Sequence, residues 1–103
     1  MIEAICIDDS GKPNDVPNNK WLEEGKIYNI IYTTTVLPQQ ELAVSLAEID
    51  LDESCYPYQY FLFSRFAIHI NNVSKFEKLI EDCVEADIDV RELMKEINLT
   101  GLT

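Results

Sequence analysis

Residue types and patterns that accompany enzyme chemistry are scarce in this chain of 103 residues. It has three glycines, too few and too scattered for a glycine-rich loop that cradles phosphate groups. Its single histidine, His69, alternates with Ile68 and Ile70 on an expected strand, and no glycine-rich nucleophile turn accompanies it. The sequence therefore predicts no catalytic residues and a protein that is not an enzyme.

Cysteine is also sparse. Cys6, Cys55 and Cys83 are odd in number, widely spaced, and form no Cys-x-x-Cys pair. A disulfide framework or a zinc site needs closer and even usage. We therefore expect reduced, mostly buried thiols, and neither a bound metal nor another cofactor.

Long apolar runs are missing as well. No stretch approaches the roughly 20 residues that cross a bilayer. The first residues, Met1 to Ala4, lack the basic segment of a signal peptide. We therefore expect a cytoplasmic protein without membrane contact. The length suits one domain, and 47% hydrophobic residues suffice for a core.

Positive charge is the last scarce feature. Eight Lys and Arg residues stand against nineteen Asp and Glu residues, which gives a net charge of −11. Residues 1–66 hold eleven acids and four bases, and residues 71–103 hold eight and four, so the excess is spread along the chain. Such a field repels phosphate backbones, which argues against direct nucleic-acid binding. It favours a basic partner, or simply solubility.

The first seventy residues have the apolar patterns of β-strands. Residues 2–7 are rich in β-branched side chains, and residues 26–35 form the clearest strand. Residues 41–49 fit either a strand or a helix, and the neighbouring strands favour a strand. Residues 58–70 leave room for a short helical turn before a last strand. One face of the clearest strand is expected to carry Tyr28, Ile30, Tyr32 and Thr34.

A long loop and a helical tail complete the pattern. Residues 8–19 combine two prolines and a glycine with short polar side chains, which predicts an exposed loop of the kind that often carries binding function. Residues 73–84 have helix spacing behind a Ser74-x-x-Glu77 capping box, and a second box at Asp89 begins another helix. Two short helices must pack on something to be stable, so we expect a helical hairpin against the sheet.

The first part of the chain resembles small SH3-like barrel proteins of bacteriophages and of prophage-rich gut bacteria. The resemblance covers roughly residues 1–70 and leaves the helical tail outside. It implies the fold and supplies no activity and no site residues. The segments that carry it are Cys6-Ile7-Asp8-Asp9-Ser10, Lys12-Pro13, Val16-Pro17, Lys20-Trp21, Gly25-x-x-Tyr28, Glu48-Ile49-x-Leu51, Pro57-Tyr58-x-x-Phe61 and Arg65-Phe66.

Pattern and resemblance together predict an α+β protein. Residues 1–70 are expected to form an SH3-like curved antiparallel sheet or barrel of about five strands. Residues 71–103 are expected to form a C-terminal helical hairpin packed on it, so that the chain is one globular unit.

The candidate binding residues lie at and beside the loop. Asp8 and Asp9 either offer oxygen ligands to a divalent cation or open a turn by hydrogen-bonding their own backbone. Arg65 lies in an apolar stretch, where a guanidinium needs a partner. It either pairs with Asp8, Asp9 or Glu24 and tethers the loop to the sheet, or contacts a carboxylate or phosphate of a ligand.

Aromatic side chains supply the other candidates. Trp21 and Tyr56 lie next to loops, so they are the aromatic residues expected at the surface rather than in the core. In SH3-like barrels the aromatic residues on and beside the first long loop form a groove for proline-rich peptides. A small barrel also fills its core with aromatic side chains, so the aromatic residues of this chain either line such a groove or pack in the core.

The sequence thus favours a non-enzymatic accessory protein of phage or mobile-element origin that binds another protein. One alternative is an acidic nucleic-acid mimic that inhibits a DNA- or RNA-binding protein, which requires most carboxylates on one face. A further alternative is a small metal-binding or enzymatic module centred on Asp8, Asp9 and Arg65. Self-association is compatible with each of these readings.

Overall fold

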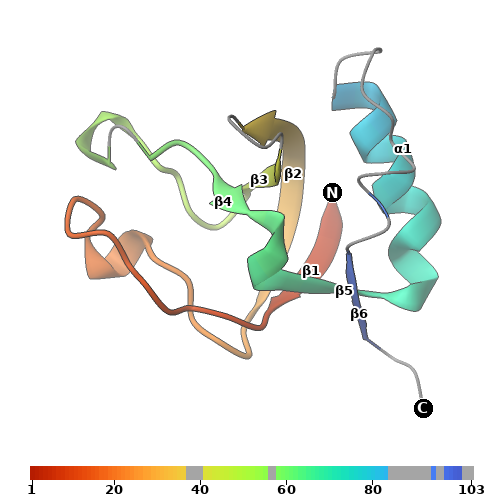
Figure 1. The fold of residues 1–103 in the computed structure, drawn as a ribbon, viewed down its shortest axis with the longest axis horizontal. Helices are drawn as coiled ribbons and strands as arrows, with labels where there is room; N and C mark the ends of the chain where they lie inside the picture. The colour runs from red at the N-terminus through yellow and green to blue at the C-terminus, as the bar shows by residue number, and fades with distance from the viewer. Residues whose placement is uncertain (37–40, 56–57, 84–93, 95–96, 101–103) are drawn as a thin grey trace.

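A six-stranded sheet with an α-helix beside it makes up the molecule (Figure 1). The computed structural model describes residues 1–36, 41–55, 58–83, 94 and 97–100. The strand order across the sheet is β4-β3-β2-β1-β5-β6. The strands are β1 (Ile2–Cys6), β2 (Ile27–Val36), β3 (Glu41–Leu46), β4 (Phe61–Leu62), β5 (Phe66–His69) and β6 (Asn98–Thr100).

Helical elements connect the strands. Four short 3-10 turns lie between or beside them, and the α-helix α1 follows β5. The last strand, β6, runs parallel to β5, whereas the other neighbouring strands are antiparallel. These elements are η1 (Asn18–Lys20), η2 (Glu53–Cys55), η3 (Phe63–Arg65), η4 (Ile70–Asn72) and α1 (Val73–Cys83).

The core covers one side of the sheet. Ala4 in the central strand β1 pairs with Tyr28 of β2 and with Ile68 of β5, and all three side chains are buried. Residues that lie opposite each other in a sheet share a face, so these pairs define the core face. The helix α1 joins the same core, because Phe76 is buried and its ring stacks on that of Phe63 at 4.6 Å between centroids.

A β-bulge changes the face of several side chains in β2. The pairing with β3 shifts between Ile30 and Tyr32, so that the alternation slips by one residue. Thr33 is consequently buried and Tyr32 is 39% exposed. The expectation that Tyr28, Ile30, Tyr32 and Thr34 share one face is therefore wrong beyond Ile30, since the buried residue that follows is Thr33.

The α+β class is confirmed, but the sheet is neither a barrel nor purely antiparallel. In the described part of the chain β4 pairs with β3 alone and β6 pairs with β5 alone, so the two edges do not meet. At one edge of the sheet, β4 has two residues and offers few backbone groups that could pair with the other edge to close a barrel. At the other edge the C-terminal segment adds a parallel sixth strand.

The strand over residues 41–49 and the first tail helix are confirmed as β3 and α1. No helical hairpin is seen in the described residues. The second helix expected from Asp89 falls mainly on residues 84–93 and 95–96, which lie outside them. The end of that expected helix, Asn98–Thr100, is strand β6. The Asn98 side chain helps to hold it there by donating from Nδ2 to the Ser64 and Phe66 carbonyls at 3.4 and 3.2 Å.

Within the residues that the structure describes, no helix is long and apolar enough to cross a membrane.

Candidate functional site

The long loop between β1 and β2 is held firmly against the sheet, as its buried side chains show. Val16 is fully buried and Leu22 belongs to the core cluster. The Trp21 ring packs 5.7 Å from that of Phe61, measured between centroids. An exposed loop over residues 8–19 is confirmed for most positions, while Asn18 and Asn19 belong to the turn η1. The loop is therefore an ordered surface feature with its own apolar anchors.

Asp8 shapes the start of the loop. Its Oδ1 accepts hydrogen bonds from the backbone amide and the hydroxyl of Ser10, the amide at 2.9 Å. These two bonds, the hydroxyl first, lower the pKa of the Asp8 carboxyl below its ordinary value. Asp8 thus forms the turn that its residue type predicts, and that turn occupies one of its oxygens.

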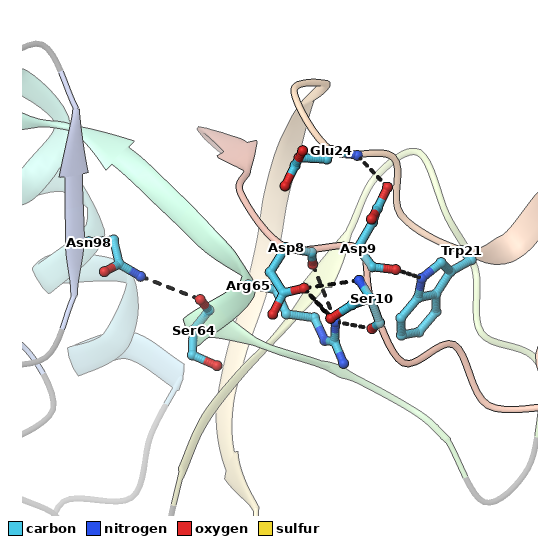
Figure 2. Close-up of polar contacts among 8 residues, drawn as sticks. All are labelled: Asp8, Asp9, Ser10, Trp21, Glu24, Ser64, Arg65 and Asn98. Atoms are coloured by element: carbon cyan, nitrogen blue, oxygen red, sulfur yellow. Dashed lines mark hydrogen bonds and ion pairs between the residues drawn. The ribbon is translucent and has the colours of Figure 1, made fainter.

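Asp9 joins the two ends of the loop (Figure 2). Its Oδ2 accepts the backbone amide of Glu24 at 3.0 Å, and its carbonyl accepts the indole Nε1–H of Trp21 at 2.7 Å. A hydrogen bond to the backbone carbonyl fixes the indole in one orientation. Asp9 and Trp21, both singled out in the sequence, therefore act on each other.

Arg65 lies under the loop and contacts it chiefly through backbone oxygens. Its Nη1 donates to the Ser10 carbonyl at 2.6 Å and to the Asp8 carbonyl at 3.3 Å, and it lies 3.8 Å from Asp8 Oδ1. Its guanidinium carbon is 4.9 Å from the centre of the Trp21 ring, which adds a cation–π contact. These contacts match the tethering interpretation of Arg65: it pairs with the Asp8 carboxylate, one of the expected acids, and two main-chain carbonyl groups lie closer still.

The other three basic residues of the first 66 also face groups of the protein. Lys12 donates from Nζ to the Val16 carbonyl at 2.6 Å, and Lys20 donates to Asp52 Oδ2 at 2.9 Å. Lys26 Nζ lies 5.5 Å from the centre of the Tyr28 ring. Together with Arg65, all four cations of this part of the chain are engaged internally. With eleven acids against four bases, this part of the chain carries a net negative charge.

A hollow of about 500 Å³ opens beside the loop. Asp9, Trp21 and Tyr28 line it together with Glu48 and Ile49 from the segment after β3. Lys12, Lys26 and Glu23 also line it, so its wall mixes both signs of charge. The hollow therefore has no charge preference that would select a ligand class.

Glu48 extends the sheet at this point. Its carboxylate accepts the backbone amide and the Nδ2–H of Asn29, at 2.8 and 2.7 Å. Desolvation acts to raise the pKa of the Glu48 carboxyl, but the hydrogen bonds from Asn29 outweigh it and lower the pKa below its ordinary value. Glu48 is thus a structural carboxylate that is hydrogen-bonded to Asn29 of β2.

The surface that sequence reasoning missed is the side of the sheet opposite the core, which we call the outer face. Ile27 and Ile31 of β2 are 56% and 47% exposed, and Ile5 of β1 pairs directly with Ile27. Tyr32 stacks on Tyr60 with 6.2 Å between ring centroids. β2 carries large apolar side chains on both faces, which is more than one core requires, and that signal is visible in the sequence.

That Tyr56 and Trp21 bind a ligand stays a prediction. Tyr56 lies outside the described residues, and Trp21 is half-buried among loop contacts. Among the described residues, no three His, Cys, Asp or Glu side chains gather as a metal site would require. His69 uses its Nδ1 to accept the backbone amide of Asn71 at 3.0 Å, where it caps η4.

The three cysteines form no disulfide with one another. Cys6 and Cys55 are buried and Cys83 is half-buried, as expected. Burial is the main cause that raises the pKa of the Cys6 thiol, so Cys6 is protonated near neutral pH.

Comparisons of the chain with protein-family models, with curated proteins and with solved structures find no match.

Proposed function

We propose that this protein is a non-enzymatic accessory protein that binds another protein through the outer face of its sheet. The observation that carries the proposal is the exposure of Ile27, Ile31 and Tyr32 on one strand. A sheet that has water on one side ordinarily alternates apolar residues inward with polar residues outward. Grouped exposed apolar side chains on a folded surface are typical of protein interaction sites.

The resemblance to small phage proteins supports an origin in a phage or mobile element as part of this proposal. We place the interaction in the cytoplasm, in line with the expectation from the sequence.

Site-specific photo-crosslinking in bacterial cells tests the proposal. A benzophenone side chain at position 31 should crosslink to one defined partner, which mass spectrometry then identifies. The matched control carries the same group at position 70, because Ile70 is 41% exposed but lies in η4, outside the strands of the sheet. No crosslinked product at position 31, or equal products at both positions, would overturn the proposal.

The acidic nucleic-acid mimic is the second candidate, favoured by the net charge of −11. It requires carboxylates gathered on one face. Glu3 is exposed on the outer face, whereas Glu81 and Asp82 are exposed on α1, which packs on the core side. This distribution supports the mimic less well than it supports a localised docking face.

The third candidate, a metal-binding or enzymatic module at Asp8, Asp9 and Arg65, draws on groups that already serve the loop. Asp8 and Asp9 accept backbone amides, and Arg65 donates to backbone carbonyls. A ligand there would compete with the contacts that order the loop, so we rank this module last.

A further inference from the structure

The outer face is acidic as well as apolar, and this combination bears on the chemistry of its partner. Glu3 lies on this face beside the Ile5–Ile27 pair, and Glu41 lies on it where β3 begins. At the outward positions of the described strands there is no Lys or Arg. Lys75 of α1 borders the face, where it lines a hollow of about 280 Å³ with Glu3 and Asn29.

Cations from elsewhere in the β part of the molecule do not neutralise this face. Lys12, Lys20 and Arg65 donate to oxygen atoms of the loop or of the segment around Asp52, and Lys26 faces the Tyr28 ring. Lys75 borders the face near Glu3, so Glu41, at the far end of the β2–β3 pairing, is the carboxylate that acts most freely on whatever approaches this face.

A second copy of this chain fits the face poorly. Each copy carries a net charge of −11, so two copies brought together through Glu3 and Glu41 would place like charges against each other. Apolar contact between the isoleucines would have to overcome that repulsion. A partner with the opposite charge gains from both interactions.

We propose that the outer face docks a basic protein segment whose Arg or Lys side chains alternate with apolar ones. This inference rests on the proposed function. The apolar side chains would cover Ile27 and Ile31. The cationic groups would reach Glu3 and Glu41 and lie against the stacked Tyr32–Tyr60 pair, since cations bind the faces of aromatic rings. Their long methylene stems would cover apolar surface on the way.

Peptide titrations followed by backbone amide NMR test this inference on the full chain. The probes are acetylated (Arg-Leu-Gly)₄, (Gln-Leu-Gly)₄ and (Glu-Leu-Gly)₄, each at 50 and 500 mM NaCl. We expect the basic peptide to shift the amides of Ile27, Ile31 and Tyr32 and to bind at least tenfold more tightly than the neutral one. High salt should reduce this difference, because it screens exposed charges.

Charge reversal localises the effect. Glu3→Lys with Glu41→Lys should weaken binding of the basic peptide at least tenfold. The control pair, Glu53→Lys with Glu81→Lys, changes the net charge equally at exposed positions of η2 and α1 and should weaken it less than threefold. Equal losses in the two pairs would mean diffuse attraction to the whole molecule and would overturn the inference.

The outcomes separate the two proposals. If the neutral peptide shifts the same amides with equal affinity, the outer face is a docking site but the preference for a basic partner is wrong. If no peptide shifts those amides, the inference of a basic partner is wrong. It is equally wrong if the chain forms a dimer through the outer face. The crosslink at position 31 then decides the proposed function on its own.

Discussion

Arg65 shows how one side chain holds a long loop without a close ion pair. Its Nη1 reaches the carbonyls of Asp8 and Ser10, and its guanidinium carbon lies over the Trp21 ring. A guanidinium can donate in its plane and stack through its face at the same time, which an ammonium group cannot do. The loop conformation therefore depends on an arginine at this position.

Replacing Arg65 with lysine should lower the free energy of unfolding by about 1–3 kcal/mol, the usual value of hydrogen bonds from charged groups. Urea unfolding followed by tryptophan fluorescence would measure the loss, since Trp21 is the single tryptophan. Lys78→Met, at an exposed site on α1, serves as the control and should change stability little. An unchanged midpoint for Arg65→Lys would contradict the tether.

Thr33 is a buried residue whose hydroxyl oxygen has no hydrogen-bond partner among the described residues. Valine has nearly the same shape and no hydroxyl, so Thr33→Val should raise the free energy of unfolding by about 1 kcal/mol. Thr33→Ser keeps the hydroxyl, loses a methyl group and should be destabilising. A loss of stability in Thr33→Val, measured by the same unfolding experiment, would show that the hydroxyl is satisfied.

At the scale of elements, Glu48 continues the pairing of β2 past the end of β3. Two hydrogen bonds from Asn29 favour the charged form and keep the folded-state pKa below the ordinary value of 4.5. A carboxyl with a lowered folded pKa stabilises the protein above its ordinary pKa, and this contribution disappears as the pH falls through the folded value. The end of the β2–β3 ladder should therefore be sensitive to acid.

Glu48→Gln should reduce the free energy of unfolding at pH 7 by about 1 kcal/mol, a small value because water screens an exposed carboxylate. The difference from the wild type should shrink as the pH drops below 4.5. Unfolding curves between pH 7 and 3 would show this. Asn29→Ala removes one of the two donors, so it should cause a smaller loss of unfolding free energy with the same dependence on pH. A difference that stays constant with pH would disprove the role of the charge.

The elements with strong local patterns were predictable. β1, β2, β3 and α1 have periodic apolar residues within a few positions of each other, and the turn before β5 was expected as well. The bulge at Ile31 was not predictable, because it depends on how β2 meets both β1 and β3. The pairing of β6 with β5 depends on residues far apart in the chain, which local periodicity cannot report.

The proximity of Arg65 to the loop was predictable, but most of its contacts were not. Asp8, Asp9, Trp21 and Arg65 do come together, since the loop begins and ends where β1 meets β5 and β2. The expected ion pair of Arg65 with Asp8 is present at 3.8 Å, but the closer contacts with the main-chain carbonyls of Asp8 and Ser10 were not expected. Sequence patterns describe side chains and carry no signal for backbone oxygens that a turn aims inward.

At the scale of the whole molecule, the net charge of −11 opposes compactness. Raising NaCl from 20 to 500 mM should raise the unfolding temperature by about 4 °C, which corresponds to about 1 kcal/mol in a domain of this size. Calorimetry at fixed pH measures the shift. A further step from 500 mM to 1 M should add little, because exposed charges are already screened, and a fall in the first step would contradict self-repulsion.

The position of β1 has a consequence for how the chain folds. Ala4 meets Tyr28 on one side but meets Ile68 on the other, so the central strand gains its second neighbour only once the chain has reached β5. Bringing such distant segments together costs entropy before any contact repays it, and domains with many such pairings fold in roughly milliseconds to seconds. Refolding should therefore be limited by the β1–β5 ladder, with a transition state in which the β2–β3 hairpin is already formed.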